Sequence, residues 1–230
     1  MSLGKPKYIS LWREKNTMKT DQEYKQLSIK EFNKAATKYE SQNSGIYEMC
    51  KEDYPPILEE IRKQNFEKLL DAGCATGPML TLLTQEYPNK QFVGLDLSPK
   101  MIEEAKKKKL KNTTFIEGDC ENMPFENNTF DTIINSQSYH HYPNPQAFFN
   151  EVYRILKPNG KLILRDNTAS DPVLFLMNNI GMKIANITGH GDVKASSIDE
   201  VKKYCRQAGL EIIKIEKQKK FRLHLVAQKN

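Results

Sequence analysis

The chain has 230 residues, of which 38% are hydrophobic and 28% charged, and its formal net charge is +6. This composition is that of an ordinary globular protein, and the length fits one domain with at most a small addition. No apolar run reaches the ~18 residues that a membrane span requires, and no charged start leads into an apolar signal core. We therefore expect a cytoplasmic protein without a membrane span.

The cysteines and the basic runs do not follow the spacing of a metal or nucleic-acid site. The basic runs at 106–109 and 217–220 lack interleaved aromatic residues, which favours a solvated surface over nucleic-acid binding. The cysteines are scattered without CxxC spacing, which favours reduced thiols over a zinc site or disulfides. They are Cys50, Cys74, Cys120 and Cys205.

The N-terminal region divides into a leader and a helical segment. The first seventeen residues precede Met18 without clear periodicity, and they are either an expression leader or a native extension. We assign residues 1–27 to a leader or flexible extension. Apolar residues at helical spacing predict a helix over Ser28–Ser41, and a second helix is expected near Tyr54–Gln64.

From residue 66 onward, apolar strand patterns alternate with helical ones, which is typical of a mostly parallel sheet covered on both faces. The last two strand patterns lie next to each other and predict an antiparallel pair. The expected fold is a doubly wound α/β domain over residues 28–230. Strands are predicted at 68–73, 91–96, 113–117, 130–135, 161–166, 211–218 and 221–228, and helices at 79–87, 98–110, 146–156 and 196–210.

The first strand-to-helix turn carries the segment LLDAGCATG, residues 69–77. Gly73 and Gly77 let the backbone bend and let a ligand approach without a Cβ in the way. In such a sheet, ligands bind beyond the carboxyl ends of the strands. A tight loop without a ligand is the alternative, and the turn alone favours nucleotide binding only weakly.

Two further acids follow the next two strands. Asp96 ends the second strand, where a carboxylate accepts hydrogen bonds from ribose hydroxyls, and Asp119 follows the third, where it can accept from the adenine amino group. The GxxxG spacing differs from the GxGxxG of dinucleotide sites, and Asp71 would repel a phosphate. An adenosine with a cationic tail therefore fits better than NAD, and S-adenosylmethionine has that shape.

The chain resembles class I S-adenosylmethionine-dependent methyltransferases, particularly those similar to the small-molecule enzymes of ubiquinone and menaquinone biosynthesis. The resemblance rests on LLDAGCATG, on VGLDLSPKMIEEAK, on the stretch from EGDC to LILRD and on an FxxxAxxY segment at Phe32 to Tyr39. It implies a Rossmann-like seven-stranded sheet with an antiparallel C-terminal strand. The implied parts are a helical lid (28–65), a cofactor-binding core (66–167), an acceptor-pocket segment (168–195) and a C-terminal helix and hairpin (196–230).

The resemblance implies that S-adenosylmethionine is the cofactor. The sequence departs from the family's glycine pattern at one position, where Ala75 stands in place of glycine. We expect a slightly tighter turn there and retained binding. Tyr39 would come from the lid, or would only pack in the core. The expected cofactor-binding residues are Tyr39, Asp71, Gly73, Thr76, Gly77, Asp96, Leu97, Met101, Asp119, Cys120, Asn135 and Ser136.

Methyl transfer to a small or medium organic acceptor is the expected activity. His140 and His141 follow the fourth strand and are the candidates for a catalytic base, unless they only shape the loop. No two histidines stand four residues apart beside an acid, so no metal is expected. The segment of about Asp21–Tyr47 is expected to close over the cofactor.

Other classes remain open alternatives. A protein of the same fold could bind the cofactor without turning over an acceptor, and an NAD-dependent oxidoreductase is a less favoured second alternative because of the GxxxG spacing. Neither nucleic acid nor a protein substrate is expected as a partner, and the sequence leaves the oligomeric state and the acceptor undetermined.

Overall fold

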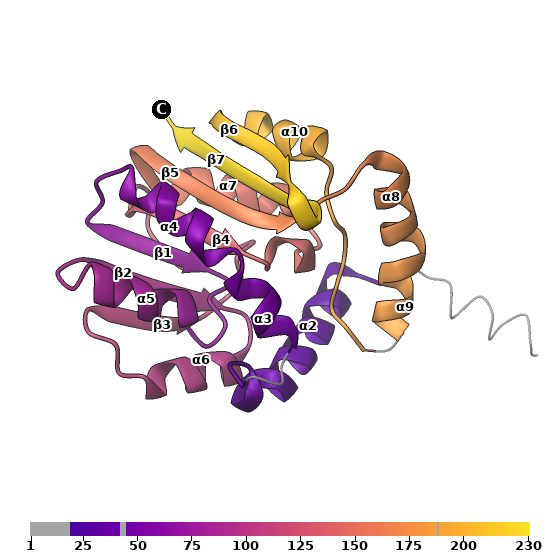
Figure 1. Ribbon diagram of the computed structural model, residues 1–230, viewed down its shortest axis with the longest axis horizontal. Coiled ribbons are helices and arrows are strands. Elements are labelled where there is room, and N and C mark those ends of the chain that lie inside the picture. The colour runs from indigo at the N-terminus through magenta and orange to yellow at the C-terminus, as the bar shows by residue number, and fades with distance from the viewer. Residues whose placement is uncertain (1–18, 42–44, 188) are drawn as a thin grey trace, which may run out of the picture.

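A seven-stranded mixed sheet forms the centre of the computed structural model, which describes residues 19–41, 45–187 and 189–230 (Figure 1). The strand order is β3-β2-β1-β4-β5-β7-β6. Strands β1 to β5 pair in parallel, and β7 is antiparallel to both of its neighbours. This confirms the predicted doubly wound sheet with an antiparallel C-terminal strand. The strands are β1 (Lys68–Ala72), β2 (Gln91–Asp96), β3 (Thr113–Glu117), β4 (Phe130–Ser136), β5 (Leu156–Asn167), β6 (Leu210–Gln218) and β7 (Arg222–Lys229).

Helices cover both faces of the sheet, as the alternation of strands and helices predicts. One face, turned toward the viewer in Figure 1, carries α4, α5 and α6, and the other carries α7 and α10. Neighbouring strand residues contribute to the cores on opposite faces of the sheet. Leu69 packs in the core beneath α4, α5 and α6, and Leu70 packs in the core beneath α7 and α10. The helices are α4 (Tyr54–Arg62), α5 (Pro78–Glu86), α6 (Pro99–Lys107), α7 (Pro145–Ile155) and α10 (Ile198–Ala208).

Helix α2 (Asp21–Ala35) begins seven residues before the predicted start at Ser28, inside the segment assigned to the leader. Thr20 caps it through a capping box with Glu23. The first turns are polar and show no apolar periodicity, which is why the pattern did not reveal them. A short 3₁₀ turn (Ala36–Lys38) and helix α3 (Gly45–Lys51) follow.

One strand boundary on the C-terminal side also differs from the prediction. Strand β5 starts at Leu156, where helix α7 was expected to end, because Leu156 pairs with Phe130 before a register irregularity. Helix α10 lies within its predicted range, with Ser197 in a capping box and Gly209 in the left-handed conformation at its end.

Residues 171–187 form a separate helical layer beside the sheet. It consists of α8 (Asp171–Leu176), a π-helical turn (Met177–Gly181) and α9 (Met182–Ile187). Met182 is buried in a small cluster with Leu174, so this methionine packs against its own layer. None of the helices in the described part of the chain combines the length and apolar character that a membrane span needs.

Candidate cofactor and acceptor site

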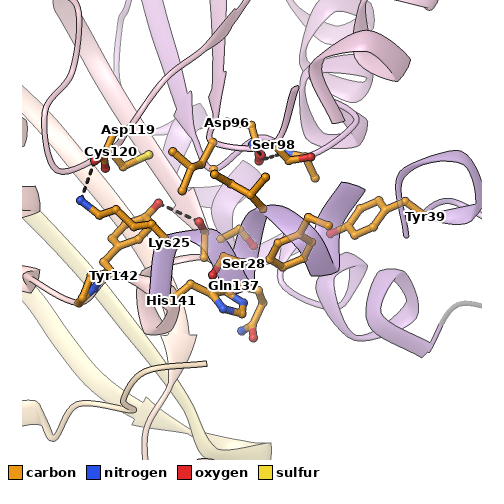
Figure 2. Close-up of a pocket in the computed structure, with 18 residues that line it drawn as sticks. Lys25, Ser28, Tyr39, Asp96, Ser98, Asp119, Cys120, Gln137, His141 and Tyr142 are labelled. Carbon is orange, nitrogen blue, oxygen red and sulfur yellow. Dashed lines mark hydrogen bonds and ion pairs between the residues drawn. The ribbon is translucent and has the colours of Figure 1, made fainter. Parts of the chain in front are cut away.

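A central pocket lies at the carboxyl edge of the parallel strands, between the loops after β1, β2, β3 and β4 and the overlying helix α2 (Figure 2). Because β1 to β4 are parallel, their carboxyl ends meet at this edge, which brings the predicted loops together. Eight predicted residues line the pocket: Tyr39, Gly73, Asp96, Leu97, Asp119, Cys120, Ser136 and His141.

The turn after β1 is tightly packed and left-handed at three positions. Gly73 has φ +81°, and a Cβ built there would lie 2.0 Å from the Ser138 Oγ, so this position requires glycine. Gly77 has φ +76° and caps helix α5. Ala75 has φ +48°, a conformation that costs an alanine about 1–2 kcal/mol relative to the ordinary right-handed region.

Asp71 is buried next to the pocket without a hydrogen-bond donor among the described residues. It lines a smaller inner cavity, which shares Tyr39, Gly73 and Ser136 with the central pocket. Burial, with a smaller contribution from the charge of Asp96, raises the pKa of Asp71 to about 8. A cation entering the inner cavity would reverse this shift, since it would stabilise the carboxylate.

Asp96 organises the loops after β1 and β2. Its two oxygens accept from the backbone N–H groups of Ala75 and Ser98, each at 2.8 Å. Burial raises the pKa of Asp96 to about 6, while these two hydrogen bonds act in the opposite direction. The carboxylate lines the central pocket, as predicted for a group that binds ribose.

Asp119 faces a cation that the sequence did not indicate. The Lys25 ammonium on α2 lies 2.6 Å from Asp119 Oδ2 and also contacts Glu121 (Figure 2). Burial disfavours the ammonium, but the two carboxylates outweigh it and raise the pKa of Lys25. Helix α2 is therefore attached by charge to the loop after β3.

Four predicted cofactor residues lie outside the lining of both cavities. Thr76 donates to Glu40, and Gly77 packs against the ring of Phe115. Met101 is fully buried against Ala36 and Tyr39. Asn135 donates to the Ala72 carbonyl at 2.8 Å and to the Tyr142 hydroxyl at 3.0 Å. These four residues support the loops, and their direct contact with a cofactor stays a prediction.

The two candidate bases differ in their surroundings. His140 Nδ1 lies 2.7 Å from Asp166 Oδ1. Although burial acts against its charge, Asp166 and Asp192 raise the pKa of His140 to about 10. Burial and the neighbouring His140 lower the pKa of His141 to about 4. Only His141 lines the pocket, where its ring meets Phe32 edge-on at a centroid distance of 5.0 Å.

Ten lining residues were not among the predicted site residues. Part of this set had a sequence signal, because Ser138, Tyr142 and Pro143 surround the histidine pair after β4, and the Ser138 and Tyr142 hydroxyls share a 2.8 Å hydrogen bond. Phe32 of α2 belongs to the FxxxAxxY segment, whereas Lys25, Ser28 and Ile29 carried no such signal. The ten are Lys25, Ser28, Ile29, Phe32, Ala75, Ser98, Gln137, Ser138, Tyr142 and Pro143.

Sequence comparisons match part of the chain to methyltransferases. Residues 70–164 match the family model described as a methyltransferase domain. Over 141 residues the chain is 33% identical to the demethylmenaquinone methyltransferase of Thermotoga maritima, with 61% of each chain covered. Over 108 residues it is 36% identical to the phthiotriol/phenolphthiotriol dimycocerosates methyltransferase of Mycobacterium leprae, covering 46% of this chain and 40% of the relative. The chain thus spans between two fifths and three fifths of these relatives.

The fold also matches solved structures. A putative methyltransferase in complex with the Trm112 methyltransferase activator of Haloferax volcanii superposes with a TM-score of 0.71 at 19% identity. The match covers 86% of this chain and 97% of that chain. At this identity the likeness establishes the shared fold.

Proposed function

We propose that the chain binds S-adenosylmethionine in the central pocket and transfers its methyl group to a small or medium organic acceptor, and the match of residues 70–164 to a methyltransferase domain supports this. The observation that carries the proposal is a pair of acids, the buried Asp71 and the half-buried Asp96, at the carboxyl ends of β1 and β2. An uncompensated buried carboxylate is costly, and a cationic ligand removes that cost.

The described residues fit the parts of the cofactor. Asp71 would bind the α-ammonium group, and Asp96 would accept from the ribose hydroxyls. Asp119 would accept from the adenine amino group and would share its carboxylate with Lys25. A dinucleotide fits less well, because its pyrophosphate would approach Asp71 at the turn after β1.

The cofactor itself supplies the activated methyl group. The chain then has to align an acceptor with that group and exclude water, and orientation of this kind supplies up to ~7–11 kcal/mol of a reaction barrier. Helix α2 covers the pocket with Ser28, Ile29 and Phe32. We place the acceptor between this helix, His141 and residues 168–195, because Gly191 of that segment already contacts Ser28 and Glu31 of α2.

The two histidines are unequal candidates for the base. His140 is held between two carboxylates and lies outside the lining of the pocket. His141 lines the pocket, but its lowered pKa makes it a weak base. We therefore propose that His140 has a positioning role. Of the two histidines, His141 is the one within reach of an acceptor.

The experiment combines binding with turnover. Calorimetry with S-adenosylhomocysteine and, separately, NADH should give binding of the first and none of the second. A panel of phenols, quinols, amines, thiols and carboxylic acids is then incubated with S-adenosylmethionine, and methylated product is detected by mass spectrometry. Binding without product from any acceptor class would favour a cofactor-binding protein, and NADH binding alone would favour an oxidoreductase.

A further inference from the structure

Three side chains that could bind a metal ion converge beside the central pocket. His140 and His141 come from the 3₁₀ turn after β4, and Asp192 comes from the loop before α10. One ligand atom from each lies within 4.8 Å of the others. We propose that His140, His141 and Asp192 bind a zinc ion at the acceptor side of the pocket.

The distances in this cluster fit metal ligands better than hydrogen bonds. His140 Nε2 lies 3.4 Å from Asp192 Oδ1, and His141 Nδ1 lies 3.6 Å from the same oxygen. In a tetrahedron with bonds of ~2.0–2.1 Å to zinc, neighbouring ligands are about 3.3–3.4 Å apart. His141 Nδ1 is also buried with no hydrogen-bond partner among the described residues, so it can offer its lone pair to a metal.

Asp166 orients the His140 ring in the way that a carboxylate orients a metal-binding histidine. Asp166 is fully buried, and its Oδ1 lies 2.7 Å from His140 Nδ1 while its Oδ2 accepts from the His140 backbone N–H at 3.2 Å. A carboxylate on the far nitrogen of a histidine fixes the ring and directs the other nitrogen to the metal. Here the other nitrogen, Nε2, faces Asp192.

The loop that carries Asp192 is fixed to the histidine turn by its own backbone. The N–H groups of Val193 and Lys194 both donate to the His140 carbonyl, at 3.0 and 3.2 Å. The Asp192 carbonyl accepts from Asn186 Nδ2 at 2.7 Å. The three ligand atoms are therefore brought together by the fold before any metal binds.

The ligand set points to the class of metal. Two imidazole nitrogens and one carboxylate suit zinc and neighbouring transition metals, whereas magnesium and calcium prefer six or more oxygens. Two of the ligand-atom distances match the edges of a zinc tetrahedron, so zinc is the ion that we propose within this class. Three protein ligands leave one position open, as in catalytic zinc sites.

His141 connects this site to the acceptor, and this part of the inference rests on the proposed function. His141 lines the central pocket, and Figure 2 shows it on the opposite side from Asp96. A zinc ion on its Nδ1 would border the space assigned to the acceptor, where it would lower the pKa of a bound hydroxyl or water. The sequence analysis predicted no metal, because it found no acid beside a suitably spaced pair of histidines. Asp192 is distant from the histidines in the sequence, so local spacing does not indicate it.

The test is a zinc titration of the full chain, made metal-free with EDTA, against a chromophoric chelator and without cofactor or acceptor. We expect one zinc per chain. Asp192→Asn and His141→Gln should each weaken binding at least about 100-fold, and Asp166→Asn about 10–100-fold, because it removes only the support of His140. Cobalt in place of zinc should give the intense visible bands of a four-coordinate site.

His190→Gln is the matched control, since it removes a histidine close to Asp192 that pairs instead with Glu31. This variant should bind zinc as the unaltered chain does, and circular dichroism checks the fold of each variant. No zinc binding by the unaltered chain, or equal binding by Asp192→Asn, would overturn the proposal. A weak six-coordinate cobalt spectrum would overturn the tetrahedral assignment. The titration contains no cofactor, so its failure leaves methyl transfer untouched.

Discussion

The Lys25 ammonium on α2 lies 2.6 Å from the Asp119 carboxylate at the end of β3. The same lysine contacts Glu121, and Asn33 of α2 accepts from Ser98 Oγ at 2.8 Å. Helix α2 is therefore attached to the loops after β2 and β3 that we expect to bind the nucleoside. Cofactor binding and the order of this helix should depend on each other.

Hydrogen exchange across Asp21–Ala35 tests that dependence. S-adenosylhomocysteine should increase the protection of the helix, because a bound nucleoside fills the space beneath it. Lys25→Gln should lower the protection of the cofactor-free protein about two- to fivefold, the effect of an ion pair worth roughly 0.5–1 kcal/mol. Lys34→Gln, at an exposed position of the same helix, is the control. Equal protection with and without ligand would identify α2 as a fixed structural element.

Asp96→Ala should weaken S-adenosylhomocysteine binding at least tenfold in calorimetry. The substitution removes a charged acceptor worth on the order of 1.5–3 kcal/mol per hydrogen bond. It also removes the acceptor of the Ala75 and Ser98 N–H groups, so thermal unfolding must be measured in parallel. Glu103→Gln, on the exposed face of α6, should leave affinity unchanged. Unchanged affinity in Asp96→Ala would rule out the ribose assignment.

Cofactor affinity should rise with pH between about 6 and 8, because burial raises the pKa of Asp71 to about 8. The free protein holds this carboxyl mostly protonated below that pH, and a cationic ligand requires the charged form. Binding must therefore release a proton, and affinity should increase up to tenfold per pH unit until it levels off near pH 8. Calorimetry in buffers of different ionisation enthalpy measures that proton. Asp71→Asn should bind the cofactor weakly, and its affinity should not change with pH in this range. If the pH dependence persists in this variant, the released proton comes from another group.

Ala75→Gly should stabilise the fold by about 0.5–1 kcal/mol. The left-handed conformation costs alanine about 1–2 kcal/mol, and the greater freedom of unfolded glycine offsets part of the gain. The midpoint of thermal unfolding should rise by roughly 1–4 °C. Ala208→Gly, at the last residue of helix α10, should change it in the opposite direction. A lower midpoint in Ala75→Gly would mean that the Ala75 methyl group contributes more by packing than its backbone loses by strain.

The sequence by itself determined the α/β architecture and the edge at which the site forms. Apolar periodicity and helix caps are encoded by residues near one another in the chain, as at Ser98, whose side chain accepts from the Met101 N–H of α6. Because parallel strands end at one edge, the positions of Asp71, Asp96 and Asp119 after three strands were enough to bring them together.

Only the tertiary structure decided which side chains complete the site. Lys25 meets Asp119 because the polar first turns of α2, which show no apolar periodicity, lie near the loop after β3. Asp192 meets His140 because backbone hydrogen bonds attach its loop to the turn after β4. Such contacts depend on the packing of segments far apart in the chain, and no local pattern encodes them. For the same reason the burial that raises the pKa of Asp71 could not be read from the segment LLDAGCATG.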